Sequence, residues 1–228
     1  MASLLQKSKV YGINATALSR RSIADCNLYI ILDTSVNSHT ELFDIVRQIV
    51  DLPGIILQLR DKSGDHDQLI PLIEKLLKLT KNMTPLIIND YVDIAQSCRV
   101  QGLHIGQDDM DYKKARAMLG VPAIIGVSCQ TLEQAQTAQS AGADYIGLGS
   151  INKTLTKPGR DPMNRRLLTQ ILKAIQIPVF GIGGITLENA PQLRELGFKR
   201  IAVCRAVCVS ANVRKTAAEF LQIFNQSK

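Results

Sequence analysis

The stretch Pro85–Met110, PLIINDYVDIAQSCRVQGLHIGQDDM, contains two short apolar runs that each end in polar residues. The first run, Leu86–Ile88, precedes Asn89–Asp90, and the second, Leu103–Ile105, precedes Gln107–Asp109. Apolar runs of this length bounded by turn residues are typical of strands that are buried on both faces, as in parallel sheets. The stretch therefore predicts two neighbouring parallel strands.

In parallel α/β folds, ligands bind beyond the carboxyl ends of the strands. We therefore expect Asp90 and Asp109 to lie side by side at one edge of the sheet. Two carboxylates with open water positions suit Mg²⁺ better than Zn²⁺. The alternative is that one of them caps the following helix while the other is only solvated.

The same strand pattern recurs along the chain, and an amphipathic stretch follows each apolar run. The predicted strands are Leu28–Leu32, Gly54–Leu59, Leu86–Ile88, Leu103–Ile105, Ala123–Val127, Tyr145–Leu148, Val179–Ile182 and Ile201–Val203. The predicted helices are Glu41–Val50, Asp67–Leu79, Val92–Cys98, Tyr112–Leu119, Leu132–Ala141, Arg165–Ala174, Leu187–Leu196 and Val213–Phe224. Thr131 and Gln134 have the spacing of a capping box.

Eight βα units in 228 residues predict an α/β protein, a single-domain (β/α)₈ TIM barrel over residues 26–228. Residues 1–25 are expected to form a short N-terminal helical extension. An open doubly wound sheet is the alternative architecture.

Composition limits the class of protein. No uncharged apolar run reaches about 18 residues, so no membrane span is predicted. The N-terminus lacks the pattern of a signal peptide. The five cysteines form no CxxC pair, which argues against a disulfide framework or a zinc site and favours a reducing, cytoplasmic setting. The sequence leaves open whether the chain forms a homo-oligomer.

Basic residues are concentrated in the last third of the chain. Residues 1–150 contain 14 Lys/Arg and 16 Asp/Glu, a charge of −2, whereas residues 151–228 contain 13 and 4, a charge of +9. This asymmetry indicates an anionic ligand. The basic residues are dispersed, without interleaved aromatic residues, so nucleic acid is not the expected partner.

Three segments at strand ends have the chemistry of phosphate binding. Gln58, Arg60 and Lys62 share one face of an extended segment, and Arg with Lys suits a polyphosphate. Thr154–Lys157 has the hydroxyls and ammonium of a phosphate lid. Gly181–Thr186, GIGGIT, enters a helix through glycines at the usual phosphate position of a barrel. Ordinary solvated loops are the alternative for the first two. His104, within a strand, is interpreted as a packed or hydrogen-bonded structural residue.

Taken in order, these motifs resemble the thiamine phosphate synthase family over about residues 28–207. The resemblance rests on QLRDK (58–62), NDYVDIA (89–95), GLHIGQDDM (102–110), IGVS (125–128), GADYIGLG (142–149), TLTK (154–157) and GIGGIT (181–186). It implies a (β/α)₈ transferase of thiamine biosynthesis that requires Mg²⁺. It also implies small-molecule substrates, a hydroxymethylpyrimidine diphosphate and a thiazole phosphate, which give thiamine phosphate and pyrophosphate.

The resemblance also implies roles for particular residues. The Mg²⁺ ligands would be Asp90 and Asp109. The pyrimidine diphosphate would be held by Gln58, Arg60, Lys62, Asn89, Ser128 and Lys157, of which Arg60, Lys62, Ser128 and Lys157 would act in catalysis. The thiazole phosphate would be held by Thr154, Thr156 and Gly184, along with the backbone at Cys204 and Arg205, and Leu155 would be a further substrate-binding residue.

Some positions depart from the family pattern. Ser150 stands where Pro is common, Arg205 where Ser is common, and Gln130 where His is common. The related thiazole tautomerases rely on that His and generally lack the Asp pair, so the tautomerase alternative is weakened. A non-catalytic barrel that binds a phosphate ligand, inactivated by Arg205 and Ser150, is the other alternative.

Overall fold

A computed structural model describes residues 23–81, 83–154 and 161–225. Strands and helices alternate through these ranges. The strands are β1 (Leu28–Asp33), β2 (Ile55–Arg60), β3 (Leu86–Asn89), β4 (Gly102–Ile105), β5 (Ile124–Cys129), β6 (Tyr145–Leu148), β7 (Val179–Ile182) and β8 (Ile201–Val203). The helices are α2 (His39–Ile49), α3 (His66–Thr80), α4 (Val92–Ser97), α5 (Tyr112–Leu119), α6 (Leu132–Ala141), α7 (Arg165–Ala174), α8 (Ala190–Leu196), α9 (Arg205–Cys208) and α10 (Val213–Asn225).

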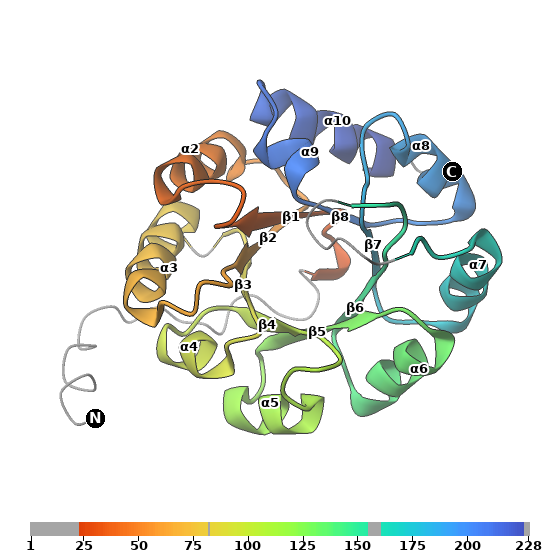
Figure 1. Ribbon diagram of the computed structural model, residues 1–228, viewed down its shortest axis with the longest axis horizontal. Coiled ribbons are helices and arrows are strands. Elements are labelled where there is room, and N and C mark those ends of the chain that lie inside the picture. The colour runs from red at the N-terminus through yellow and green to blue at the C-terminus, as the bar shows by residue number, and fades with distance from the viewer. Residues whose placement is uncertain (1–22, 82, 155–160, 226–228) are drawn as a thin grey trace.

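The eight strands form a closed barrel in which every neighbouring pair is parallel. The barrel closes where β1 pairs with β8, with Leu28 opposite Ile201. Figure 1 looks down the barrel and shows the helices as a ring around the strands. The predicted TIM barrel is confirmed. The pairing of β1 with β8 excludes the open doubly wound sheet, because an open sheet has two unpaired edges.

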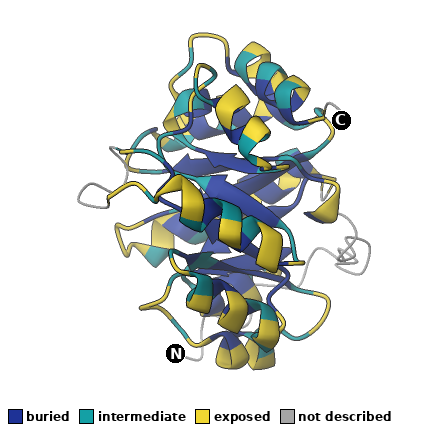
Figure 2. Cartoon of the chain, turned by 90° about the vertical axis from the view of Figure 1, so that its right-hand side faces the viewer, coloured by how far each residue is buried: buried dark blue, intermediate teal, exposed yellow. Residues whose placement is uncertain are grey.

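The strands separate two apolar cores. Along each strand, alternate side chains point to opposite faces of the sheet. One set packs between the strands and the helices, for example Leu28, Ile30 and Leu32 of β1. The other set fills the barrel interior, with Tyr29 and Ile31 as its members from β1. Figure 2 shows the buried strands at the centre and exposed residues on the outer faces of the helices. Burial on both faces explains why the strands are nearly continuous apolar runs.

Most element boundaries agree with the sequence prediction to within about two residues. The predicted capping box of α6 is confirmed, since the Thr131 hydroxyl accepts from the Gln134 N–H and the Gln134 side chain accepts from the N–H of Thr131. Helix α8 begins three residues later than predicted, at Ala190, because Asn189 extends the preceding turn. Its side chain accepts from the Thr186 N–H at 3.0 Å and donates to the Gly184 carbonyl at 2.8 Å.

The predicted N-terminal extension lies outside the described residues except for its last three positions. Ile23 is 1% exposed and packs in the barrel-interior core. None of the described helices is both long and apolar enough to cross a membrane.

Candidate active site

A cavity of about 370 Å³ opens at the carboxyl ends of the strands. Its lining includes eight of the residues that the sequence singled out, namely Gln58, Arg60, Asn89, Ser128, Thr154, Gly184, Cys204 and Arg205. The side chains of Lys62, Asp90 and Asp109 are not part of this lining. Leu155, Thr156 and Lys157, of the predicted lid, lie outside the described residues. The fold therefore gathers residues from the ends of β2, β3, β5, β6, β7 and β8 around one space.

Three aromatic rings form the floor of the cavity. Tyr29, Tyr145 and Phe180 come from β1, β6 and β7 and line the cavity while being almost completely buried. Their ring centroids are 5.4–5.7 Å apart, with interplanar angles between 62° and 79°. Such edge-to-face packing is favourable between aromatic rings. The cavity thus has an apolar aromatic base beneath a polar rim.

A line of hydrogen bonds crosses this floor from β2 to β5. Gln58 Nε2 donates to the Tyr29 hydroxyl at 2.9 Å, and the Tyr29 and Tyr145 hydroxyl oxygens are 2.8 Å apart. Tyr145 lies 3.0 Å from His104 Nδ1, and His104 Nε2 lies 2.9 Å from Ser128 Oγ. We call these five residues the polar chain. His104 is hydrogen-bonded, as the sequence interpretation expected.

The two tyrosines of the polar chain were not among the residues predicted for the site. Tyr29 and Tyr145 lie within apolar strand runs, where a tyrosine is ordinarily a core residue. Only the alternation of side chains along β1 and β6 could have placed both hydroxyls inside the barrel. The usable signal was therefore the alternation of side chains along each strand rather than a motif of polar residues.

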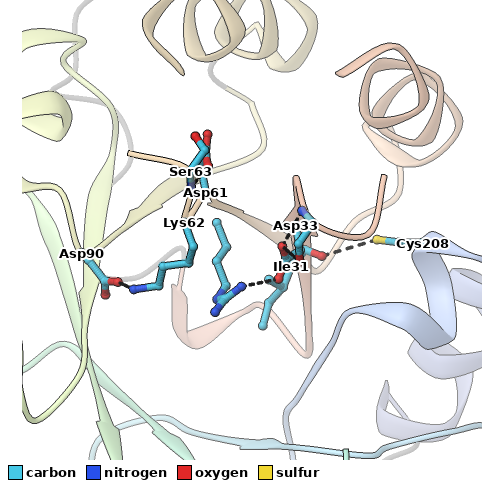
Figure 3. A network of polar contacts seen from close by, with 9 residues as sticks. Ile31, Asp33, Asp61, Lys62, Ser63, Asp90 and Cys208 are labelled. Atoms are coloured by element: carbon cyan, nitrogen blue, oxygen red, sulfur yellow. Dashed lines mark hydrogen bonds and ion pairs between the residues drawn. The ribbon is translucent and has the colours of Figure 1, made fainter. Parts of the chain in front are cut away.

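Arg60 is held by a buried carboxylate. The register of β1 and β2 places Asp33 directly opposite Arg60, and Arg60 Nη1 lies 2.6 Å from Asp33 Oδ2. The other oxygen, Oδ1, accepts from the N–H and hydroxyl of Ser35 at 2.9 and 2.6 Å. The Asp33 side chain is 0% exposed and that of Arg60 13%. Figure 3 shows Asp33 in the same view as Lys62 and Asp90, which a dashed line joins.

Asp33 is missing from the predicted site because the first predicted strand ends at Leu32. The structure extends β1 by one residue to include it. The available signal was an aspartate that directly follows an apolar run, at the level where the next strand has an arginine.

Asp90 and Asp109 meet as predicted. The Asp90 carboxylate forms an ion pair with the Lys62 ammonium and lies within hydrogen-bonding reach of the Asp109 carboxyl. Asp109 is an exposed residue, yet partial desolvation of its carboxyl raises its pKa, and the neighbouring Asp90 adds to this effect. The Gly106 N–H, 2.6 Å from Asp109 Oδ2, opposes the rise.

The backbone at Asp90 is unusual. Its φ is +68°, a left-handed conformation that Asp tolerates better than most residues. The Tyr91 N–H donates to the Asn89 carbonyl at 2.9 Å, and the Asp90 N–H donates to the His104 carbonyl at 2.9 Å. The Asp90 side chain at this turn pairs with Lys62, which follows β2.

The helix-cap alternative for the two carboxylates is wrong. Helix α5 is capped by Asp111, whose side chain accepts from the N–H groups of Lys113 and Lys114. Helix α4 has no side-chain cap. Neither Asp90 nor Asp109 therefore caps the helix that follows it.

The paired carboxylates fit a hard divalent cation. Two adjacent oxygen ligands, partly desolvated and open to water on one side, are what Mg²⁺ accepts in proteins. Within the described ranges no three His, Cys, Asp or Glu side chains gather as a metal site. A cation here would thus complete its coordination with water or substrate oxygens, and Lys62 already supplies one positive charge to the pair.

The glycine loop after β7 packs tightly against the loop after β6. The Asn152 N–H donates to the Gly183 carbonyl at 3.0 Å, and the Asn152 side chain donates to the Gly184 carbonyl at 3.2 Å. Gly183 and Gly184 have φ of +106° and +57°. A Cβ at Gly184 would overlap the Lys153 carbonyl. Only glycine permits this approach.

Three departures from the family pattern can be placed. Ser150 is buried, and its hydroxyl donates to the Asn152 carbonyl at 2.6 Å, so the side chain stabilises its own loop. Arg205 is an exposed residue at the start of α9 that contributes to the cavity lining. Gln130 is held through its N–H, which donates to Gln134 Oε1 at 2.7 Å.

Comparisons with known proteins show what the chain is similar to. A thiamine-phosphate synthase from Ruminiclostridium cellulolyticum is 36% identical over 205 residues, which cover 90% of this chain and 98% of that protein. Another from Methanobrevibacter smithii is 35% identical over 201 residues, covering 88% and 96%. A solved thiamine phosphate pyrophosphorylase from Pyrococcus furiosus matches with a TM-score of 0.79 and 29% identity, covering 89% and 97%.

More distant structures share only the barrel. A 3-hexulose-6-phosphate synthase superposes with a TM-score of 0.66 at 15% identity, covering 86% of this chain and 99% of that one.

The family model described as thiamine monophosphate synthase matches residues 28–207, from the first residue of β1 into α9. Because this model covers most of the chain and the relatives are more than 30% identical over nearly their whole length, the chain belongs to the thiamine monophosphate synthase family of enzymes.

Proposed function

We propose that the chain is a Mg²⁺-dependent thiamine phosphate synthase. It would couple 4-amino-2-methyl-5-(diphosphooxymethyl)pyrimidine with a thiazole phosphate and release thiamine phosphate and pyrophosphate. The observation that carries the proposal is one cavity whose lining combines aromatic rings, the Arg60 guanidinium and the glycine loop. Arg60 and Asn89 would bind the diphosphate, with Lys62 held near them by Asp90, and the glycine loop at Gly184 would bind the thiazole phosphate.

The residues proposed to bind the diphosphate favour departure of an anion. When the bond between the pyrimidine methylene carbon and the diphosphate oxygen breaks, the electron pair leaves with pyrophosphate. Arg60 and Lys62 would stabilise the charge that develops there, and Lys157 is proposed to add to it. Because Asp33 fixes the guanidinium of Arg60 before the reaction, little reorganisation is needed during it. Bound to Asp90 and Asp109, Mg²⁺ would supply further neutralisation of the leaving group.

The floor and the glycine loop would position the two reacting atoms. The rings of Tyr29, Tyr145 and Phe180 suit a flat heteroaromatic ring, whose cation after bond breaking is resonance-stabilised. Gly184, with Thr154 and Arg205, lines the cavity where the thiazole phosphate would be held. The thiazole nitrogen then attacks the methylene carbon. Positioning contributes much of the rate in such a step, and no protein nucleophile is required.

Product analysis tests this proposal. Purified protein, Mg²⁺ and both substrates should yield thiamine phosphate, detected by mass spectrometry, and omission of either substrate should abolish the product. The non-catalytic alternative predicts binding of the thiazole phosphate without product. That result would contradict the proposal, and Arg205→Ser would then test whether this side chain blocks the reaction.

A further inference from the structure

The orientation of the Gln58 amide sets the direction of the polar chain. Gln58 Nε2 can only donate, so the Tyr29 oxygen accepts. The Tyr29 proton then needs an acceptor, and the Tyr145 oxygen lies 2.8 Å away. Tyr29 is 2% exposed, so an unpaired hydroxyl there would bear the full cost of desolvation. Tyr29 therefore donates to Tyr145.

The remaining bonds follow in order. Tyr145 has accepted from Tyr29, so its own proton goes to Nδ1 of His104. A neutral imidazole has one N–H, and with Nδ1 accepting, that N–H lies on Nε2. Nε2 then donates to Ser128 Oγ. Ser128 keeps its hydroxyl proton for another acceptor, and Ser128 lines the cavity.

Burial supports the protonated state of both phenols. It raises the pKa of Tyr29 and of Tyr145 well above the ordinary value, so both hydroxyls keep the protons that the chain requires. Neighbouring glycines also make room for the rings. A Cβ at Gly126 would overlap the ring of Tyr145, and a Cβ at Gly147 would lie 3.3 Å from Cε1 of His104.

The opposite orientation of the Gln58 amide would reverse every hydrogen bond of the polar chain. With the Gln58 amide turned around, its oxygen would accept from Tyr29, and Tyr145 would donate to Tyr29. Nδ1 of His104 would then donate to Tyr145, and Ser128 would donate to Nε2. The hydroxyl of Ser128 would no longer be available to a ligand as a donor. The tautomer of His104 therefore reports which direction the chain takes.

We propose that the polar chain holds His104 as the Nε2–H tautomer and so makes the Ser128 hydroxyl a hydrogen-bond donor into the cavity. Tyr145 is the positioning residue at the centre of this chain, because it links the Gln58 side of the floor to His104. The catalytic consequence rests on the proposed synthase function, whereas the tautomer does not.

The tautomer can be measured directly. The chain has three histidines, so ¹⁵N-labelled imidazole spectra recorded well above the ordinary histidine pKa of about 6.5 are readily assigned. The variants His39→Gln and His66→Gln identify the other two signals without altering residue 104. The expected result is a protonated Nε2 and an unprotonated Nδ1 at His104. A protonated Nδ1 would overturn the proposal, whether or not the protein proves to be a synthase.

Substitution of Tyr145 tests its positioning role. Tyr145→Phe keeps the ring in its place against Gly126 but removes the bond to Nδ1, so the His104 signals should show a mixture of tautomers. The kcat should fall about two- to tenfold, the effect of one hydrogen bond, with less change in either KM. The control is Tyr112→Phe, whose hydroxyl instead donates to the Gly142 carbonyl outside the barrel.

A second substitution completes the test. Tyr29→Phe removes the hydroxyl that links Gln58 to Tyr145, so it should also give a mixture of His104 tautomers. This variant replaces Tyr145→Phe if the latter does not fold. Wild-type tautomer and kcat in a folded Tyr145→Phe protein, matching Tyr112→Phe, would overturn the positioning role.

Discussion

The ion pair of Asp33 and Arg60 is a buried electrostatic contact that the sequence interpretation did not include. Asp33→Asn leaves the guanidinium of Arg60 buried without its counterion, which typically costs about 3–5 kcal/mol. We expect a fall of roughly this size in the free energy of unfolding, measured by urea denaturation. The affinity for the pyrimidine diphosphate should fall too, because Arg60 is no longer fixed.

The matched control is Asp51→Asn. Asp51 also pairs with an arginine, Arg214, but both side chains are about half exposed or more, at 63% and 49%. Exposed pairs contribute little to stability, so this variant should keep the wild-type urea midpoint. Equal effects of the two substitutions would contradict the importance given to the buried pair.

Asp109 is the second residue for which we predict the effect of a substitution. If it holds Mg²⁺ with Asp90, Asp109→Asn should lower the Mg²⁺-dependent rate by on the order of 100-fold while the fold stays intact. Circular dichroism checks the fold, and the rate is measured across a Mg²⁺ titration. Asp108→Asn removes the same charge from an exposed neighbour and should behave as wild type. Full activity of the Asp109 variant would exclude it as a ligand.

At the scale of elements, the contact between the loops after β6 and β7 makes a testable claim about Gly184. Gly184→Ala introduces a Cβ against the Lys153 carbonyl, so the loops must separate. Backbone N–H groups that bind a phosphate would be displaced. We expect the KM for the thiazole phosphate to rise about tenfold or more, since hydrogen bonds to charged groups are strong.

Gly120→Ala is the control for Gly184→Ala, because it strains the backbone without placing a Cβ against another described atom. Gly120 also has a positive φ, +68°, but a Cβ there would meet no atom of the described residues within 4 Å, and Gly120 ends α5 away from the cavity. This variant should lose stability without a change in KM. A similar KM for the two variants would show that the loop contact does not shape the phosphate site.

The sequence predicted the elements because burial on both faces of a strand leaves a clear signal. The runs at Tyr145–Leu148, Val179–Ile182 and Ile201–Val203 form strands at the predicted residues. The predicted start of α8 was wrong because the turn through Asn189 depends on contacts with the glycine loop. Helix α9 was not predicted, since four residues have no detectable periodicity.

The candidate site was predicted only where polar residues follow strands. Gln58, Arg60 and Ser128 were found in this way and line the cavity. Asp33 and Tyr145 were not, because their roles arise from pairing across the barrel, and one strand contains no information about its register with the next. The interior of a barrel is therefore harder to read from sequence than its rim.

At the scale of the whole molecule, the barrel shields most of its thiols. Burial raises the pKa of Cys26 to about 11 and that of Cys129 to about 12. A hydrogen bond with Cys204, together with burial, raises the pKa of Cys208. Because the thiolate is the reactive form, these three should react with Ellman's reagent only slowly near neutral pH, and faster as the pH approaches their pKa.

Counting reactive thiols checks this expectation. The native protein should show at most two rapidly reacting groups, from Cys98 and Cys204, whereas all five should react in urea. Rapid reaction of all five without denaturant would mean that the barrel opens far more readily than its packed interior indicates.

We propose that this barrel joins two substrates with release of pyrophosphate. The most direct measurement is pyrophosphate release by the purified protein with both substrates, in Mg²⁺ and then in excess chelator. We predict release that needs both substrates and stops on chelation. Tight binding of either substrate without any release would contradict the claim and favour a barrel that only binds a phosphate ligand.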